Sequence, residues 1–211
     1  MKGRLEHRGR LARVLVGRAA LVLLVLAMAA CTTMREQPVV YYVLRDAAAP
    51  PAPPVRLGRS TLLVAPMEVE RFYDTTAIAF SRAPGTRGYY RYAFWTDRPG
   101  QAFTRLLLAR LETAGAFSGV ALTTSGVDGD FILNTTLAEL YHDAATAPGM
   151  ARVRVTAELV DRRTQRLVAR KTFDHAAPAA SYDAAGAVAG FRQAMGAILE
   201  ALTLWVADTV R

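Results

Sequence analysis

Residues that support catalysis and metal binding are scarce in this sequence. Its 211 residues include one cysteine and three histidines, of which His142 and His175 lie beyond the first 30 residues. One thiol cannot close an internal disulfide, so the fold must depend on its packed core. Two isolated histidines lack the ligand spacing of a zinc site, and no serine stands in the Gly-x-Ser-x-Gly pattern of esterases. We therefore expect neither an enzyme nor a metal site, and we interpret both histidines as solvated residues.

Apolar runs long enough to cross a membrane are also missing. The uncharged apolar run over residues 19–30 has twelve residues, too few for a helix that must span roughly 30 Å of hydrocarbon. Arginines precede this run, and it ends in Met28-Ala29-Ala30-Cys31. A basic start, a short apolar centre and small residues before a cleavage point are typical of a secretory signal. We expect residues 1–30 to be removed as a signal peptide.

The cysteine after this run resembles the lipobox of bacterial lipoproteins. The resemblance implies a covalent diacylglycerol on the Cys31 thiol and an N-acyl chain such as palmitate on its amine, with no other cofactor. Two or more acyl chains anchor a protein stably, so the domain would sit on a membrane without spanning it. Thr32-Thr33 lacks the aspartate that resembles an inner-membrane retention signal. We therefore expect the protein at the periplasmic face of the outer membrane.

The strongly basic charge of the chain belongs largely to the signal peptide. Residues 1–30 hold six of the 26 basic residues and one of the 18 acidic ones, so their removal lowers the net charge from +8 to +3. A nucleic-acid-binding protein needs a basic footprint, and most of it would be discarded here. We expect no nucleic-acid partner.

The remaining pattern predicts a short tether and one folded domain. Residues 31–56 hold the lipid anchor, one short strand and a proline-rich linker, and residues 57–211 form the domain. At about 3.3 Å per residue, the ten residues from Cys31 to Tyr41 reach roughly 30 Å. The domain is therefore expected to stay close to its anchor.

Apolar periodicity predicts many strands and two helices. One helix is expected to start at Asp97 and end at Gly115, and the other to start at Ser181 or Asp183. Strands adjacent in sequence favour an α+β fold, with a mostly antiparallel sheet and two main helices packed on it in a single domain. The strands are expected over residues 39–44, 61–69 with a break at Pro66, 77–81, 89–95, 120–123, 130–141, 151–159 and 166–173.

Aromatic residues are concentrated in one segment. Eight of the 18 aromatic residues lie within residues 72–95. Alternation along a strand places Tyr90, Tyr92 and Phe94 on one face and Trp95 on the other. Two interpretations stay open, a core with a covered sheet and an exposed aromatic patch for a protein or lipid partner. The candidate partner contacts in this segment are Tyr89, Tyr90, Tyr92, Phe94 and Trp95.

A second candidate surface is the strongly basic hairpin over residues 152–171. Its net charge of +5 exceeds that expected for the whole mature domain. One interpretation is a solvated edge protected against aggregation, and the other is a docking surface for an acidic partner or anionic headgroups. The candidate contacts are Arg152, Arg154, Arg162, Arg163, Arg166, Arg170 and Lys171.

The order of these features resembles the ABC-type transport auxiliary lipoprotein family, the PqiC-like proteins. The similarity covers nearly all of residues 31–210. It rests on Cys31, Tyr41-Tyr42-Val43-Leu44, the strand over residues 62–69, Trp95-x-x-x-Pro99 before a helix, Gly-Asp-Phe at 129–131 and the final amphipathic helix. The chain departs at Gln165, where the family often has glycine in the late hairpin turn.

The resemblance implies a non-catalytic accessory role. Family members are outer-membrane lipoproteins that accompany MCE-domain proteins and ABC transporters in moving lipids or hydrophobic solutes, and they have no assigned catalytic residues. The implied partners are the outer membrane, an MCE-domain protein and the transporter components, and a homo-oligomer is compatible with this role. The alternatives are a structural or regulatory envelope lipoprotein, such as a cell-wall synthesis activator or outer-membrane assembly factor, and a lipid carrier with its own cavity.

Overall fold

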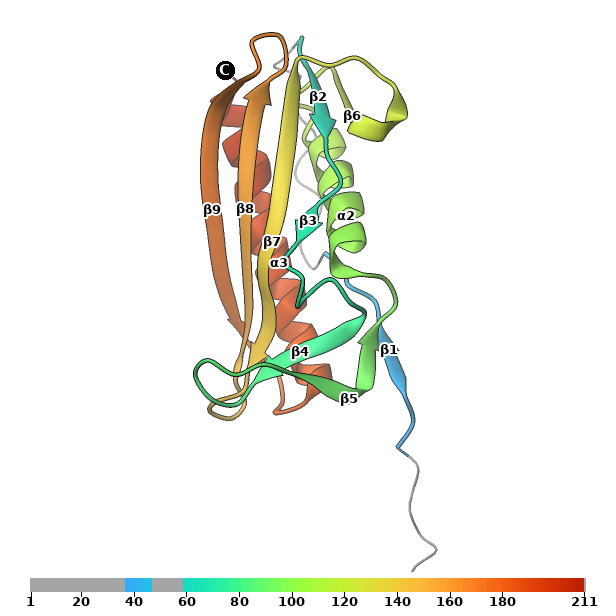
Figure 1. Cartoon of the computed structure of the whole chain (residues 1–211), viewed down its shortest axis with the longest axis vertical. Helices are drawn as coiled ribbons and strands as arrows, with labels where there is room; N and C mark the ends of the chain where they lie inside the picture. The colour runs from blue at the N-terminus through green and yellow to red at the C-terminus, as the bar shows by residue number, and fades with distance from the viewer. Residues whose placement is uncertain (1–36, 47–58, 211) are drawn as a thin grey trace, which may run out of the picture. The chain divides into compact units, whose positions relative to one another are not determined.

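Two helices and nine strands make up residues 37–46 and 59–210, the part of the chain that the computed structural model describes (Figure 1). The predicted signal peptide and Cys31 lie outside these residues. The helices are α2 (Pro99–Ala114) and α3 (Ala184–Thr209), and a 3-10 turn, η1, covers Thr123–Ser125. The strands are β1 (Val40–Tyr42), β2 (Thr61–Val64), β3 (Glu68–Val69), β4 (Ala77–Ser81), β5 (Gly88–Trp95), β6 (Gly119–Leu122), β7 (Phe131–Asp143), β8 (Met150–Asp161) and β9 (Arg166–Pro178).

The sheet is mixed, so the prediction of a mostly antiparallel sheet is wrong in this detail. The pairs β4–β5, β7–β8 and β8–β9 are antiparallel, as expected for strands joined by short turns. The pairs β1–β5, β2–β6, β2–β7, β3–β7 and β4–β7 are parallel. Parallel pairs need long connections, and the α2 segment lies in the chain between β2 and its neighbours β6 and β7. The two-helix α+β domain itself is confirmed, and residues from Val39 onward form one unit.

Helix α3 covers one face of the long antiparallel strands (Figure 1). The alternation along β8 places Ala151, Val153 and Val155 under this helix, and all three are fully buried. Asp183 is the N-cap, as predicted, and its Oδ1 accepts a hydrogen bond of 2.8 Å from the backbone N–H of Gly186. This bond, with a second from the Ser181 hydroxyl, holds the pKa of Asp183 below its usual value.

Helix α2 starts and ends at turn-forming residues. Pro99 occupies its first turn, and Gly115 ends it with a φ of 59°, in the left-handed region that favours glycine. The prediction of Asp97 as the N-cap is wrong, because Arg98 takes that position without a side-chain cap. Asp97 forms an ion pair of 2.8 Å with Arg105 on the exposed side of the helix instead.

The late hairpin turn keeps a left-handed residue without glycine. Gln165 has a φ of 57°, the conformation that the missing glycine would adopt most readily. Side chains hold this turn: Gln165 Nε2 donates to the Arg162 carbonyl at 2.6 Å, and Asp161 accepts from the Thr164 N–H at 2.7 Å. The turn therefore forms despite the departure from the family pattern.

Candidate functional site

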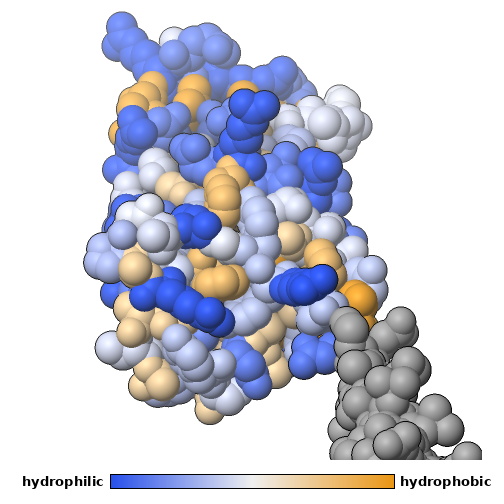
Figure 2. Space-filling model, turned by 60° about the horizontal axis from the view of Figure 1, so that its bottom comes forward, coloured by the Kyte–Doolittle hydropathy of each residue, from blue (hydrophilic) through white to orange (hydrophobic). Residues whose placement is uncertain are grey.

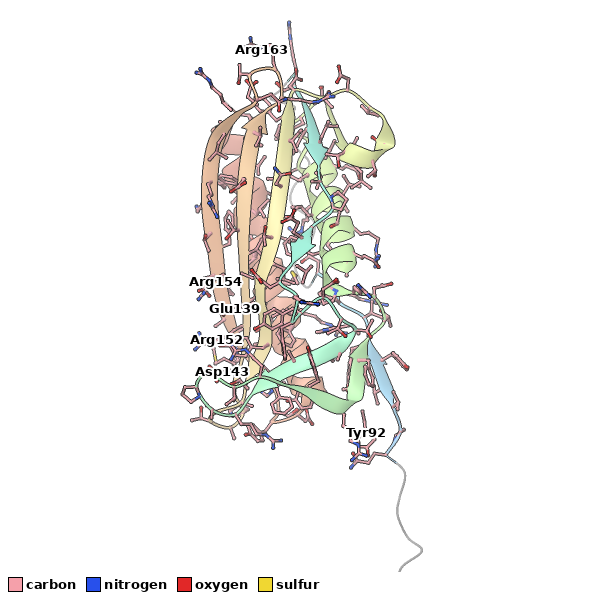
Figure 3. All side chains as sticks on the ribbon, viewed as in Figure 1. Tyr92, Glu139, Asp143, Arg152, Arg154 and Arg163 are labelled. Atoms are coloured by element: carbon pink, nitrogen blue, oxygen red, sulfur yellow. The ribbon has the colours of Figure 1, made fainter. Side chains whose placement is uncertain are left out.

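The aromatic surface lies at one end of the domain, whereas the basic hairpin runs along the long strands and has its turn at the other end (Figure 3). The β4–β5 hairpin and β1 form one end, called here the lower end, whereas the β8–β9 turn lies at the upper end (Figure 1). Tyr92 and Arg163 mark these two ends in Figure 3. A partner could therefore contact one of these surfaces without the other.

Trp95 belongs to the core and not to a contact surface. Its side chain is 2% exposed, and its ring meets Phe191 of α3 edge to face with centroids 5.6 Å apart. The predicted alternation is confirmed, because Trp95 and Ala93 point inward while Tyr92 is exposed. The inward face of β5 thus fastens the lower end to α3.

The half-buried Tyr90 and the fully buried His142 form a polar pair. His142 is 0% exposed, which makes the expectation of a solvated histidine wrong, whereas His175 is exposed as predicted. The Tyr90 hydroxyl lies 2.6 Å from His142 Nδ1, and His142 Nε2 lies 2.9 Å from the Pro148 carbonyl oxygen. Burial raises the pKa of Tyr90 to about 12. This pair ties the β4–β5 hairpin to the β7–β8 turn, so Tyr90 has a structural partner already.

Tyr89 is 42% exposed but its ring is held in place. It stacks on Phe72 with centroids 4.6 Å apart, and its hydroxyl donates to the Phe72 carbonyl at 2.7 Å. Trp95 lies in the core and Tyr90 is bound to His142. Of the five predicted aromatic contacts, this leaves Tyr89, Tyr92 and Phe94 available at the surface.

The outward face of β1 and β5 carries an apolar strip that is partly exposed. Register pairs Tyr41 with Phe94, whose rings lie 5.8 Å apart. We call the set of Val39, Tyr41, Val43, Tyr92 and Phe94 the β1–β5 strip. Tyr41 is 64% exposed and Val39 is 50% exposed. In the space-filling view the lower end shows apolar residues interleaved with strongly hydrophilic ones (Figure 2).

Three arginines of the lower end lie over aromatic rings. Arg82 lies 5.0 Å from the Phe80 centroid, Arg91 5.3 Å from that of Tyr92, and Arg87 3.6 Å from that of Tyr141. Arg87 also donates a hydrogen bond of 3.0 Å to the Tyr73 hydroxyl. Within the described residues, none of the three arginines has an acidic side chain within ion-pair distance. Sequence reasoning missed these arginines, although the stretch from Asp74 to Asp97 holds no acidic residue between its ends.

The basic hairpin is largely neutralised by acidic residues that lie outside it. Arg152 pairs with Asp143 at 2.9 Å, and Arg154 pairs with Glu139 at 3.2 Å and with Asp174 at 2.7 Å (Figure 3). The hydrogen bonds that Arg152 donates to Asp143 and that Arg154 donates to Asp174 raise the pKa of both arginines. The other ion pairs of the hairpin are Arg162 with Asp128 and Arg170 with Glu158. This arrangement resembles a solvated sheet surface more than an open basic patch.

Three of the predicted basic contacts keep their charge free of such pairs. Among the described residues, Arg163, Arg166 and Lys171 have no carboxylate within 4.0 Å. Lys171 instead lies 5.3 Å from the ring centroid of Phe173 at the edge of the sheet. The upper end therefore keeps only a small positive site, formed by Arg163 and Arg166 around the turn.

These surfaces are suited to binding. In the described part of the chain, no group of three or more histidine, cysteine, aspartate and glutamate side chains is placed to hold a metal ion. Of the helices described, none combines the length and the hydropathy needed to cross a membrane. A groove with a volume of about 560 Å³ lies at the upper end, where polar residues such as Ser60, Asp130 and Gln165 line it.

A comparison with protein families decides the identity of the chain. A family model described as the ABC-type transport auxiliary lipoprotein component matches residues 42–202. The chain belongs to this family. No curated protein matches the chain.

Solved structures agree with this fold. The auxiliary lipoprotein is 27% identical to a Xanthomonas campestris protein of the DUF330 family, with a TM-score of 0.72 over 81% of this chain and 96% of that one. An uncharacterised protein of 13% identity covers 81% of this chain and 99% of its own length at a TM-score of 0.63, a likeness of fold alone.

Family membership defines the role of the auxiliary lipoprotein in general terms. It is an accessory component of ABC-type transport and a lipoprotein of the cell envelope. The family is one of transport components and not of enzymes.

Proposed function

We propose that this protein is the outer-membrane-anchored periplasmic accessory subunit of an ABC transport system that moves lipids or hydrophobic solutes together with an MCE-domain protein. Its action is positional: acyl chains on Cys31 hold the domain at the membrane, and the domain holds one end of the transport path. A homo-oligomer at that end is part of the proposal. The supporting observation is the family match over residues 42–202 downstream of a lipobox-like cysteine.

The anchoring half of the proposal depends on Cys31. A Cys31→Ala variant cannot receive the diacylglycerol, so it is expected to leave the outer-membrane fraction and to lose transport. The matched control is Thr33→Ala, which changes a nearby residue and leaves the thiol in place. A Cys31→Ala protein that still fractionates with the outer membrane and supports transport would contradict the anchor.

The partner half is tested by isolation of the native complex. The protein carrying a C-terminal affinity tag is purified from solubilised envelopes after mild crosslinking. The expected co-purifying proteins are an MCE-domain protein and the permease and ATPase of its transporter. Recovery of cell-wall synthases or outer-membrane assembly proteins in their place would overturn the transport assignment and favour a regulatory lipoprotein.

A further inference from the structure

We propose that the lower end of the domain docks on the phospholipid surface that holds its anchor, using the β1–β5 strip and Arg82 and Arg91. The inference rests on the lipid anchor of the proposed function, because it concerns how the anchored domain is oriented. The occupant is a leaflet that contains anionic phospholipid headgroups.

Chain length brings this end of the domain to the membrane. Tyr41 comes ten positions after Cys31 in the sequence, which corresponds to a distance of roughly 30 Å at most when the chain is extended. Tyr41 lies in β1, at the lower end (Figure 1). The turn that contains Arg163 lies at the opposite end, beyond the long strands β7, β8 and β9 (Figure 3). An anchored domain therefore presents the β1–β5 strip, and not the basic hairpin turn, to the bilayer most often.

The strip has the composition that favours a membrane interface. Its exposed side chains are two valines and two tyrosines, with Phe94 half-buried beside Tyr41. Tyrosine has an apolar body and a polar tip, so it is favoured at the headgroup level of bilayers. Tyr92 points away from the domain at this end (Figure 3). Transfer of these side chains into the interface would remove apolar surface from water.

The arginines of the lower end supply charge complementarity to anionic headgroups. Arg82 and Arg91 are exposed, and the ion pairs of the described residues do not involve them. Each lies over an aromatic ring, which leaves its guanidinium able to bind phosphate bidentately. The attraction of one basic side chain to an anionic membrane surface changes the docked-to-undocked ratio by about fivefold.

The test measures the depth of spin labels on the mature lipoprotein reconstituted into vesicles. Because acylation blocks the Cys31 thiol, a label reacts only with an introduced cysteine. Val39→Cys and Val43→Cys place labels on the strip, and Arg163→Cys places one at the upper end. Collisions of each label with oxygen and with a water-soluble nickel complex are compared in vesicles of phosphatidylethanolamine with and without phosphatidylglycerol.

The expected result is that both strip labels are several-fold more protected from the nickel complex than the Arg163→Cys label when phosphatidylglycerol is present. Replacing Arg82 and Arg91 together by glutamine is expected to lower the docked-to-undocked ratio by up to about 25-fold. The matched control replaces Arg163 and Arg166 by glutamine, which removes the same charge from the upper end and is expected to leave the ratio unchanged.

Failure of the anchor and failure of the docking give different results. If the protein without an introduced cysteine takes up label, or does not float with the vesicles, the anchor of the proposed function is refuted. If the protein floats and stays unlabelled but all three labels are equally accessible to the nickel complex, the docking is refuted. Protection that appears only after a transporter protein is added also refutes the docking, because the occupant is then a protein.

Discussion

The hydroxyl of Tyr90 is expected to stabilise the fold through the buried His142. The Pro148 carbonyl oxygen can only accept a hydrogen bond, so His142 Nε2, which lies 2.9 Å away, must carry the hydrogen. The neutral ring then accepts from Tyr90 at Nδ1, over 2.6 Å. A Tyr90→Phe variant leaves this nitrogen buried without a donor. We expect the free energy of unfolding at neutral pH to fall by about 1–3 kcal/mol.

The same hydroxyl predicts an alkaline dependence of stability. Burial raises the pKa of Tyr90 to about 12 in the folded protein. In an unfolded chain the pKa of tyrosine is about 10. Between these values the unfolded chain has released a proton that the folded protein still holds. The free energy of unfolding therefore falls as pH rises, by at most about 3 kcal/mol for a pKa difference of about two, and by less where water screens the half-buried phenol. Tyr90→Phe has no proton to release, so its deficit relative to the wild type is expected to narrow above about pH 10.

Urea unfolding followed by tryptophan fluorescence measures the loss of stability at neutral pH and its change in alkaline solution. Trp95 is buried in the core, and Trp205 packs against the core, so both report on unfolding. The control is Tyr92→Phe, which removes a hydroxyl from an exposed residue and is expected to change stability by less than about 0.5 kcal/mol. Equal stability of the Tyr90→Phe and Tyr92→Phe variants at neutral pH would refute the buried hydrogen bond. A Tyr90→Phe deficit that stays constant into alkaline solution would refute the burial of the phenol.

Three further substitutions test the packing, a buried charge and a helix cap. Gly190→Ala places a Cβ 2.9 Å from the Pro178 carbonyl oxygen, so α3 must shift, and the thermal midpoint is expected to fall by the equivalent of about 1–3 kcal/mol. Arg110→Met removes the guanidinium from Asp46, whose side chain is 15% exposed, and urea unfolding is expected to show a loss of about 3 kcal/mol. Asp183→Ala removes the N-cap of α3 and is expected to cost about 1 kcal/mol at neutral pH. Because the pKa of Asp183 is lowered in the folded protein, this cost is expected to disappear as pH falls below that value.

The buried pair and the helix cap each have a control. For the buried pair, Arg105→Met breaks the ion pair with Asp97, whose side chains are 61% and 40% exposed, and is expected to cost no more than about 1 kcal/mol. A loss as small for Arg110→Met would contradict the role of burial. The Asp183→Ala variant serves as its own control in acid, where the wild-type carboxylate is protonated. A stability difference from the wild type that persists there would contradict a stabilising role of the charged carboxylate. Unchanged stability of Gly190→Ala would mean that the close approach of α3 to the sheet is not required.

Local signals in the sequence were sufficient for the elements but not for their pairing. Pro66 interrupts the second predicted strand, Gly115 ends α2 and Asp183 begins α3, and each of these acts within its own turn of chain. The neighbours of β2 depend on long connections. Its Leu62 and Val64 are fully buried, which indicates an internal strand but does not identify β6 and β7 as its parallel partners. The prediction therefore correctly assigned the basic hairpin and missed the parallel pairs of the sheet.

The net charge of a sequence segment differs from the charge of the surface that it forms, because strand pairing brings in residues from other parts of the chain. The basic hairpin has a strong positive charge within its own stretch of sequence. Glu139, Asp143 and Asp174 nevertheless reach its arginines from neighbouring strands. In the β4–β5 hairpin the reverse holds, because no strand of the described part of the chain brings a carboxylate within 4.0 Å of Arg82 or Arg91. A segment with few basic residues can thus have a larger share of them free of ion pairs than a segment with many basic residues. Surface charge follows strand pairing, so the candidate surfaces could be ranked only once the register was known.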